Sequence, residues 1–263
     1  GMTATIFRTG YGYIHKGEGA LFDTLAFDLT SVDKFNRLVK EGYLTKLISK
    51  ATEFELDSDG VGRIGGDYNL KELSQAHDRA AITKAAIKET IATGKNYKKW
   101  LVFAVDIKHA DSINEELQLQ GVNSDVLHSN TNSRRDEIIE EFKSGDTKAL
   151  VSVGMVTTGF DAPNIDMIVL LRPTMSPVLH VQMVGRGLRV SEGKDHCLVL
   201  DFACNIPRIG PINNPHIKEK NERTQASGKG MVFAKKCPKC KVLHPIKEVR
   251  CYTCGHIFEF ATK

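Results

Sequence analysis

Apolar residues along this chain gather into short, nearly unbroken runs separated by segments of helical periodicity. Five of these runs predict buried strands, at 100–105, 125–128, 149–153, 165–171 and 196–202. Apolar spacings of three and four residues predict helices at 109–119 and, after a cap at Asn132 or Ser133, through Phe142, stopped by Gly121 and Gly145. Strands that alternate with helices in this way indicate an α/β fold, in which a parallel sheet is covered by helices on both faces.

The first hundred residues carry weaker signals. Glycines predict a flexible loop at 9–19, 26–30 alternates like a short strand, and Ser31 caps a helix that continues to Lys40. We expect extended backbone at 47–54, a glycine- and aspartate-rich loop at 57–67, and one long or two shorter amphipathic helices at 69–93.

A helix after the 165–171 run brings two arginines together. Ser176 and Pro177 open this helix. It carries Gln182, Arg186 and Arg189, which are spaced four and three residues apart and therefore share one face. Two guanidiniums beside a glycine suit a polyphosphate ligand. The alternative is that both arginines only solvate a surface helix.

Several polar residues follow directly after predicted strands. These are His128, Ser129, Thr157, Gly159 and Asp161. Right-handed crossovers place the carboxyl ends of parallel strands on one edge of the sheet, where ligands bind in open α/β sheets. We therefore expect all five residues along that edge.

Composition excludes some classes of protein. The 263 residues are 41% hydrophobic, which is enough for a sizeable core, and no apolar run approaches the roughly 20 residues of a membrane span. Residues 2–8 do not read as a signal peptide, so we expect a cytoplasmic protein without a membrane partner. A net charge of +4 permits nucleic-acid binding but requires any phosphate contact to come from a local patch.

Four segments resemble motifs of superfamily 2 DEAD/DEAH-type helicases. T-T-G-F-D at 157–161 resembles motif V, and Q-M-V-G-R-G-L-R at 182–189 resembles motif VI, Q-x-x-G-R-x-x-R. W-L-V-F-A-V at 100–105 resembles motif IV, and M-T-A-T-I-F-R at 2–8 resembles motif III, which closes the first motor domain. The resemblance runs from Thr3 to about Phe202 and is greatest to the RadD-like group and its restriction-enzyme-motor relatives.

This resemblance implies a RecA-like domain of the P-loop NTPase type and a role for each motif residue. Arg186 would be the arginine finger on ATP, Arg189 its companion, and Gln182 would orient the attacking water or hold the arginines. Asp161 would accept a ribose hydroxyl and Gly159 would give the nucleotide room. His128, Ser129, and Thr157 or Thr158 would contact nucleic-acid phosphates, while Thr3 and Thr5 would couple the two sites. The alternative for each threonine or serine is a cap or a turn.

The sequence contains no G-x-x-x-x-G-K-[ST] phosphate loop and no D-E-x-H or D-E-A-D motif. We therefore expect ATP and Mg²⁺ to be held mainly by a first RecA-like domain, which this polypeptide would need in cis, and no ATP hydrolysis by the chain alone. The resemblance favours DNA over RNA as the partner. Alternative functions are the motor part of a type I or III restriction enzyme subunit and a non-catalytic nucleic-acid-binding or annealing module.

Four cysteines near the C-terminus have the spacing of a metal site. Cys237, Cys240, Cys251 and Cys254 form C-x₂-C-x₁₀-C-x₂-C, which predicts a structural Zn²⁺ ribbon. The expected organisation is 1–45 as the tail of the first domain and the crossover, 46–205 as the second RecA-like domain, 206–230 as a linker and 231–263 as the ribbon. Loss of the metal is expected to unfold the ribbon and to leave the α/β domain nearly unchanged.

Overall fold

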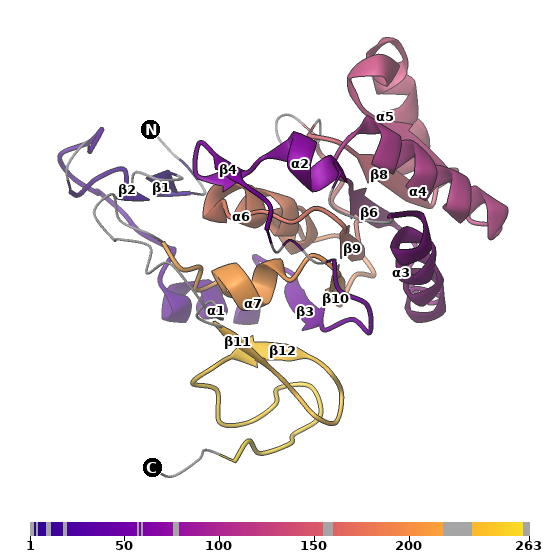
Figure 1. The fold of residues 1–263 in the computed structure, drawn as a ribbon. Coiled ribbons are helices and arrows are strands. Elements are labelled where there is room, and N and C mark those ends of the chain that lie inside the picture. Colours follow the sequence, from indigo (N-terminus) through magenta and orange to yellow (C-terminus); the bar gives the residue numbers. More distant parts are fainter. Residues whose placement is uncertain are drawn as a thin grey trace.

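The computed structural model describes residues 3, 5–8, 12–17, 20–56, 58, 60–75, 79–154, 160–217 and 233–259. Its centre is a six-stranded parallel sheet in the order β3-β10-β9-β6-β8-β7 (Figure 1). The strands are β3 (Lys46–Lys50), β10 (His196–Asp201), β9 (Met167–Leu170), β6 (Trp100–Phe103), β8 (Ala149–Ser152) and β7 (Ser124–Leu127). The predicted α/β fold with a parallel sheet is confirmed, and β3 overlaps the segment 47–54 expected to be extended.

Helices cover both faces of the sheet, because each helix carries an apolar stripe that must be buried. On one face, α3 (Arg79–Thr93) and α4 (Ile107–Leu119) pack on Trp100 and Val102. On the other face, α5 (Arg135–Ser144) and α6 (Pro177–Gly185) pack on Leu101 and Phe103. Alternate residues of β6 thus serve opposite faces, as the period of two of a strand requires.

Several expected elements differ in detail. The segment 26–30 forms no strand, and 57–67 contains a small hairpin of β4 (Arg63–Ile64) and β5 (Asp67–Tyr68). The region 69–93 holds two helices, α2 (Leu70–Gln75) and α3. A 3₁₀ turn, η1 (Ser129–Arg134), precedes α5, so neither Asn132 nor Ser133 is the cap of that helix.

The N-terminal part of the chain lies beside α6. It contains the hairpin of β1 (Phe7–Arg8) and β2 (Gly12–Tyr13) and the helix α1 (Val32–Lys40). Ser31 occupies the N-cap position of α1 as predicted, but its side chain makes no capping hydrogen bond. A short helix, α7 (Asn205–Ile209), occupies the start of the segment expected to be a linker. No helix in the described part of the chain is long and apolar enough to cross a membrane.

Residues 233–259 form a small lobe, here called the cysteine lobe, which docks on the edge strand β3 (Figure 1). It contains β11 (Ala234–Lys236) paired antiparallel with β12 (Leu243–Pro245). Val242 bridges to Lys50, and the backbone N–H of Ala51 donates to the carbonyl of Lys241 at 2.8 Å. Ala234 and Leu243 belong to the same core cluster as β6 and α5. The lobe therefore packs against the α/β domain and shares its core.

Candidate arginine site and four-cysteine centre

The two motif VI arginines sit in a turn that follows α6. The helix ends at Gly185, Arg186 begins the 3₁₀ turn η2 (Arg186–Leu188), and Arg189 is extended. The expectation that Gln182, Arg186 and Arg189 share one helix face is therefore wrong for Arg189. We call residues 186–189 the arginine turn.

Both guanidiniums nevertheless converge on one backbone oxygen. Nη1 of Arg186 donates to the carbonyl of Phe160 at 2.9 Å, and Nη1 of Arg189 donates to the same carbonyl at 3.2 Å. Arg189 also forms an ion pair with Asp161. Burial lowers the pKa of Arg186 and the charge of Arg189 lowers it further, while Asp161 acts in the opposite direction. The turn thus holds two like charges together against one carbonyl and one carboxylate.

Two residues without any motif fix the backbone of the arginine turn. The ammonium of Lys194 donates to the carbonyls of Gly187, Arg189 and Pro163 at 3.0, 2.8 and 3.0 Å. Thr45 donates from its hydroxyl to the Arg189 carbonyl and from its backbone N–H to the Leu188 carbonyl, both at 2.7 Å. Sequence reasoning missed both residues, because one lysine and one threonine far apart in the chain carry no local signal.

These contacts place the arginine turn at the amino edge of the sheet. Thr45 directly precedes β3, and Lys194 precedes β10 by two residues. The cause is the direction of α6, which starts beyond the carboxyl end of β9 and runs back along the strands. Nine residues of helix span about 14 Å, similar to the roughly 13 Å of a four-residue strand. The prediction that Asp161 lies along the carboxyl edge with His128 and Ser129 is therefore wrong.

A large open groove of about 2070 Å³ borders the arginine turn. Gln182, Asp161 and Arg189 line it on one side, and Thr3 and Thr5 line it from the N-terminal segment. The hydroxyl of Thr3 donates to the carbonyl of Thr5 at 3.1 Å and accepts from the Thr5 backbone N–H at 3.2 Å. Thr3 and Thr5 therefore line the same groove as Asp161, Gln182 and Arg189.

The two glycines that flank Arg186, Gly185 and Gly187, differ in the space around them. A Cβ on Gly187 would lie 2.6 Å from the Sγ of Cys197 and 3.0 Å from Cδ1 of Ile168, because the turn lies directly on β10 and β9. A Cβ on Gly185 would meet nothing within 4 Å, and Gly185 lines the groove. The space beside Gly185 leaves room for a ligand or a second domain.

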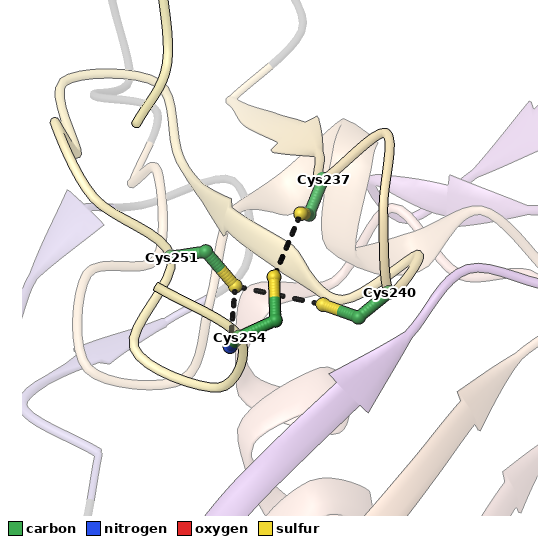
Figure 2. Close-up of side chains that lie close together, drawn as sticks. All are labelled: Cys237, Cys240, Cys251 and Cys254. Carbon is green, nitrogen blue, oxygen red and sulfur yellow. Dashed lines mark hydrogen bonds between the residues drawn. The ribbon is translucent and has the colours of Figure 1, made fainter. Parts of the chain in front are cut away.

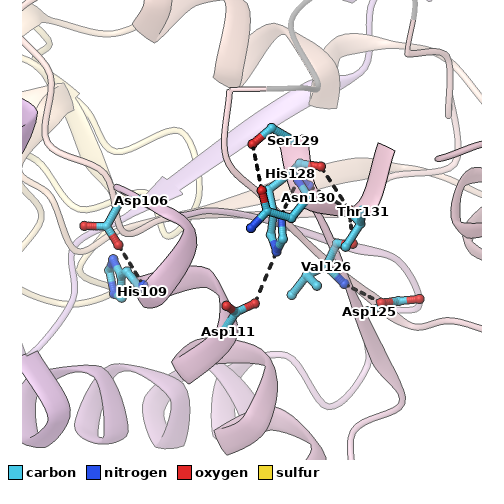
Figure 3. Close-up of polar contacts among 9 residues, drawn as sticks. All are labelled: Asp106, His109, Asp111, Asp125, Val126, His128, Ser129, Asn130 and Thr131. Atoms are coloured by element: carbon cyan, nitrogen blue, oxygen red, sulfur yellow. Dashed lines mark hydrogen bonds and ion pairs between the residues drawn. The ribbon is translucent and has the colours of Figure 1, made fainter. Parts of the chain in front are cut away.

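At the carboxyl edge, His128 and Ser129 follow β7 (Figure 3). His128 is only 4% exposed. Its Nδ1 accepts from the backbone N–H of Asn130 at 3.2 Å, and its Nε2 lies 3.2 Å from a carboxylate oxygen of Asp111. His128 therefore caps η1 and has no ring nitrogen left for a phosphate. Ser129 is exposed and can donate to a ligand. Thr157, Thr158 and Gly159 lie outside the described residues.

The four cysteines of the cysteine lobe come together as the spacing predicts. Their Sγ atoms all lie within 4.8 Å of one another, and the side chains point toward a common centre (Figure 2). The Cys237–Cys254 and Cys240–Cys251 sulfur pairs are 3.6 and 3.5 Å apart. A tetrahedron with Zn–S bonds of about 2.3 Å has edges near 3.8 Å, so the sulfurs are spaced for Zn²⁺. Although burial raises the pKa of Cys251, the backbone N–H groups of Cys254 and Thr253 lower it to about 6, which favours a thiolate ligand.

Comparison with known proteins identifies the domain that contains the arginine turn. Residues 82–191 match the family model described as "Helicase conserved C-terminal domain". The chain is 36% identical over 181 residues to IRC3 of Saccharomyces cerevisiae, provisionally named an ATP-dependent helicase, covering 68% of this chain and 26% of that protein. It is 30% identical over 219 residues to the provisionally named mitochondrial ATP-dependent helicase irc3 of Schizosaccharomyces pombe, covering 80% and 33%. The chain thus spans well under half the length of these relatives.

Similarity to solved structures is partial. A fragment of a provisionally assigned type I restriction enzyme HsdR subunit from Vibrio vulnificus matches with a TM-score of 0.49 at 20% identity, over 68% of this chain and 36% of that one. The Hef helicase domain of Pyrococcus furiosus matches with a TM-score of 0.35 at 25% identity, over 49% and 27%. The motifs, the sheet and the matched family model agree, and residues 82–191 of this chain are a helicase conserved C-terminal domain.

Proposed function

We propose that this chain is the C-terminal motor domain of an ATP-dependent DNA helicase or translocase, and that Arg186 and Arg189 act on the phosphates of ATP. The observation that carries the proposal is the convergence of both guanidiniums on the Phe160 carbonyl, in a turn of which Leu188 and Arg189 line an open groove. Arginines that only solvated a surface helix would not share a buried acceptor. Here the pair is held in place by the backbone, with Arg189 38% exposed toward the groove.

Phosphoryl transfer spreads negative charge over the γ-phosphate oxygens, and an inserted guanidinium stabilises that charge. Arg186 serves as the finger and Arg189 as its companion. Asp161 is 72% exposed, so an oxygen remains available for a ribose hydroxyl beside its ion pair with Arg189. Gln182, one helical turn before Arg186, lines the same groove and orients water or the arginines.

The remaining parts of an ATP site come from another RecA-like domain. Within the described residues, the four-cysteine centre is the one group of three or more close metal-ligating side chains, so the carboxylates for Mg²⁺ belong to that other domain. Mg²⁺ supplies charge neutralisation on the β- and γ-phosphates when bound. The chain by itself is therefore inactive as an ATPase.

Nucleic acid contacts the carboxyl edge through the exposed Ser129, at the opposite ends of the strands from the arginine turn, and Thr157 or Thr158 provides a further phosphate contact. Such contacts hold the phosphate backbone without reading sequence. The RadD-like resemblance favours DNA. Relatives named ATP-dependent RNA helicase ROK1 match at 28–30% identity over 38–41% of the chain, so RNA is the competitor to include in every binding assay.

The four-cysteine centre holds structural Zn²⁺. Four sulfurs leave no open position for a water, which suits a structural site. The metal stabilises a lobe of only 27 residues, 233–259, whose own core consists of three buried residues with Cys240 packed against them.

The test of the arginine site is ATP turnover in two polypeptides. The first is this chain alone, for which we expect no turnover above background. The second is a fusion in which a phosphate-loop RecA-like domain precedes Thr3, for which we expect DNA-stimulated turnover. Arg186→Ala should lower kcat of the fusion by about 10³- to 10⁵-fold. Arg135→Ala on α5 is the control and should have little effect.

Two results would contradict the proposal. One is ATP hydrolysis by the chain alone that Arg186→Ala abolishes, which would mean a complete site within these residues. The other is an active fusion whose turnover is unchanged by Arg186→Ala.

A further inference from the structure

The net positive charge of the chain comes from the cysteine lobe. Residues 233–259 contain six lysines and arginines and two glutamates, a net charge of 6 − 2 = +4. The whole chain has 36 basic and 32 acidic residues, also +4, so the other residues together are neutral. Zn²⁺ on four thiolates carries a formal charge of −2 and leaves the lobe at +2. A small lobe with this excess is a candidate site for a polyanion.

The basic side chains of the lobe are open to solvent. Lys236, Lys239, Lys241, Lys247 and Arg250 are all exposed. Among the described residues, none of the five forms an ion pair with a carboxylate. Their charge is therefore available to an external ligand, and the packing of the lobe does not require it.

The same lobe also carries an exposed aromatic ring. Tyr252, between the second pair of cysteines, is 46% exposed. The fully buried ring of His244 packs edge-on against it, with centroids 4.5 Å apart. The ammonium of Lys46, from the first residue of β3, lies 5.3 Å from the centroid of the Tyr252 ring. The ring is therefore held in place by His244, and a cation from the α/β domain lies over it, which an incoming base would displace.

This combination of groups selects among possible partners. An exposed aromatic ring in a lobe whose exposed lysines form no ion pair suits single-stranded nucleic acid, in which unpaired bases stack on aromatic rings and lysines neutralise the backbone. Duplex binding would use the charges but not the ring. The bridge between Val242 and Lys50 joins the lobe to β3, so a strand bound there is held rigidly relative to the motor.

We propose that the cysteine lobe binds a single strand of nucleic acid, with a base stacked on Tyr252 and phosphates on Lys239, Lys241 and Lys247. Lys46 extends this surface onto the helicase domain. The proposal is independent of the arginine site, because it requires neither ATP nor a second RecA-like domain.

The experiment measures binding of a fluorescent 20-nucleotide oligothymidylate to the zinc-loaded chain by anisotropy, without nucleotide, over a series of salt concentrations. A matched duplex and a uridylate strand are compared. The lobe variant is K239Q/K241Q/K247Q. The control variant K84Q/K88Q/K108Q removes the same charge from exposed lysines of α3 and α4. Zinc content is measured for each protein to show that the lobe is intact.

We expect the lobe variant to bind the single strand at least tenfold more weakly at about 0.1 M salt. The slope of log K against log salt should fall by about 2, since each lost phosphate contact removes about 0.7. Tyr252→Ala should weaken single-strand binding about fivefold or more, and Tyr252→Phe should keep it, because stacking needs only the ring. Duplex affinity should be insensitive to Tyr252→Ala.

Equal weakening by the lobe and control variants would overturn the proposal, because net charge alone would then explain binding. Wild-type affinity in both the lobe variant and Tyr252→Ala would also overturn it, and would leave the exposed apolar side chains of the lobe to a protein contact. Failure of these variants leaves the ATPase test of Arg186 unaffected, so the two proposals fail separately.

Discussion

Replacement of Gly187 by alanine tests how the arginine turn is held against the sheet. The new Cβ would lie 2.6 Å from Sγ of Cys197 and 3.0 Å from Cδ1 of Ile168, and both residues are fully buried in the central strands. Neither neighbour can move away at low cost, so the turn must shift outward. Overpacking of this kind costs about 1–3 kcal/mol of stability. For a chain of this size, each kcal/mol corresponds to about 2–4 °C in Tm.

Thermal unfolding followed by circular dichroism measures this effect, with Gly185→Ala as the matched control. A Cβ at Gly185 meets nothing, and its φ of −60° is helical, so alanine there should be neutral or stabilise by up to about 1 kcal/mol. In a Cys197→Ala background, Gly187→Ala should cost less, because the Sγ contact is gone. Equal Tm values for the two glycine variants, or no coupling to Cys197, would refute the close contact between turn and strand.

Other predictions concern titration, metal and backbone contacts. Burial lowers the pKa of His180 to about 4 and raises that of Asp201 to about 6, so the folded state binds fewer protons at one site and more at the other. Between about pH 4 and 6, His180 makes the free energy of unfolding rise with pH and Asp201 makes it fall, so the two contributions oppose each other. In urea titrations, stability should rise with pH for Asp201→Asn and fall with pH for His180→Gln, each by roughly 1 kcal/mol per pH unit relative to the wild type. Profiles parallel to that of the wild type would contradict this assignment. Zinc chelation or Cys251→Ser should lower the Tm of the whole chain, because the lobe shares core residues and a backbone hydrogen bond with the α/β domain. Two independent unfolding transitions in calorimetry would contradict this. Lys194→Met removes two hydrogen bonds to the arginine turn and one to Pro163, and should lower the free energy of unfolding by about 1–3 kcal/mol. Lys108→Met, at an exposed site, should leave it almost unchanged.

The sequence alone suggests that metal loss unfolds only the cysteine lobe, whereas the structure predicts destabilisation of the whole chain. The difference arises because the lobe covers an edge strand of the sheet. An exposed edge strand needs cover, and residues 241 and 242 provide it for β3 through the bonds to Ala51 and Lys50. Polar composition between 206 and 230 favours a flexible linker and gives no sign of such docking. Long-range contacts of this kind depend on tertiary packing, which local pattern does not encode.

The central strands were predictable because buried parallel strands read as unbroken apolar runs. The four-cysteine centre was predictable because four ligands at fixed spacing carry a strong local signal. The convergence of Arg186 and Arg189 was predictable only in outline. Helical periodicity places Arg189 on the face of α6, whereas the turn from Arg186 leaves the helix and reaches Phe160 by another path. The groups that fix this path, Thr45 and Lys194, come from outside every motif.

Placement of the site at one edge of the sheet was the largest error. Residues that follow strands in sequence usually lie at the carboxyl edge, but Asp161 belongs to a long connection that has already reached the arginine turn. His128 was likewise chosen by its position after a strand, and in the structure its Nδ1 caps η1 while its Nε2 lies beside Asp111. The direction of a strand determines the edge of the sheet at which the following loop starts, whereas tertiary contacts determine where each residue of that loop lies.

The central claim is that Arg186 and Arg189 meet a triphosphate held by a second RecA-like domain. Its most direct test is a high-resolution structure of the fusion with ADP and a metal-fluoride analogue of the transferred phosphate, in which the distances from both guanidiniums to the analogue are measured. We predict that Arg186 lies within about 3 Å of the analogue, a charge-assisted hydrogen bond, with Arg189 beside it. Both side chains remaining on the Phe160 carbonyl, with no contact to the nucleotide, would contradict the claim.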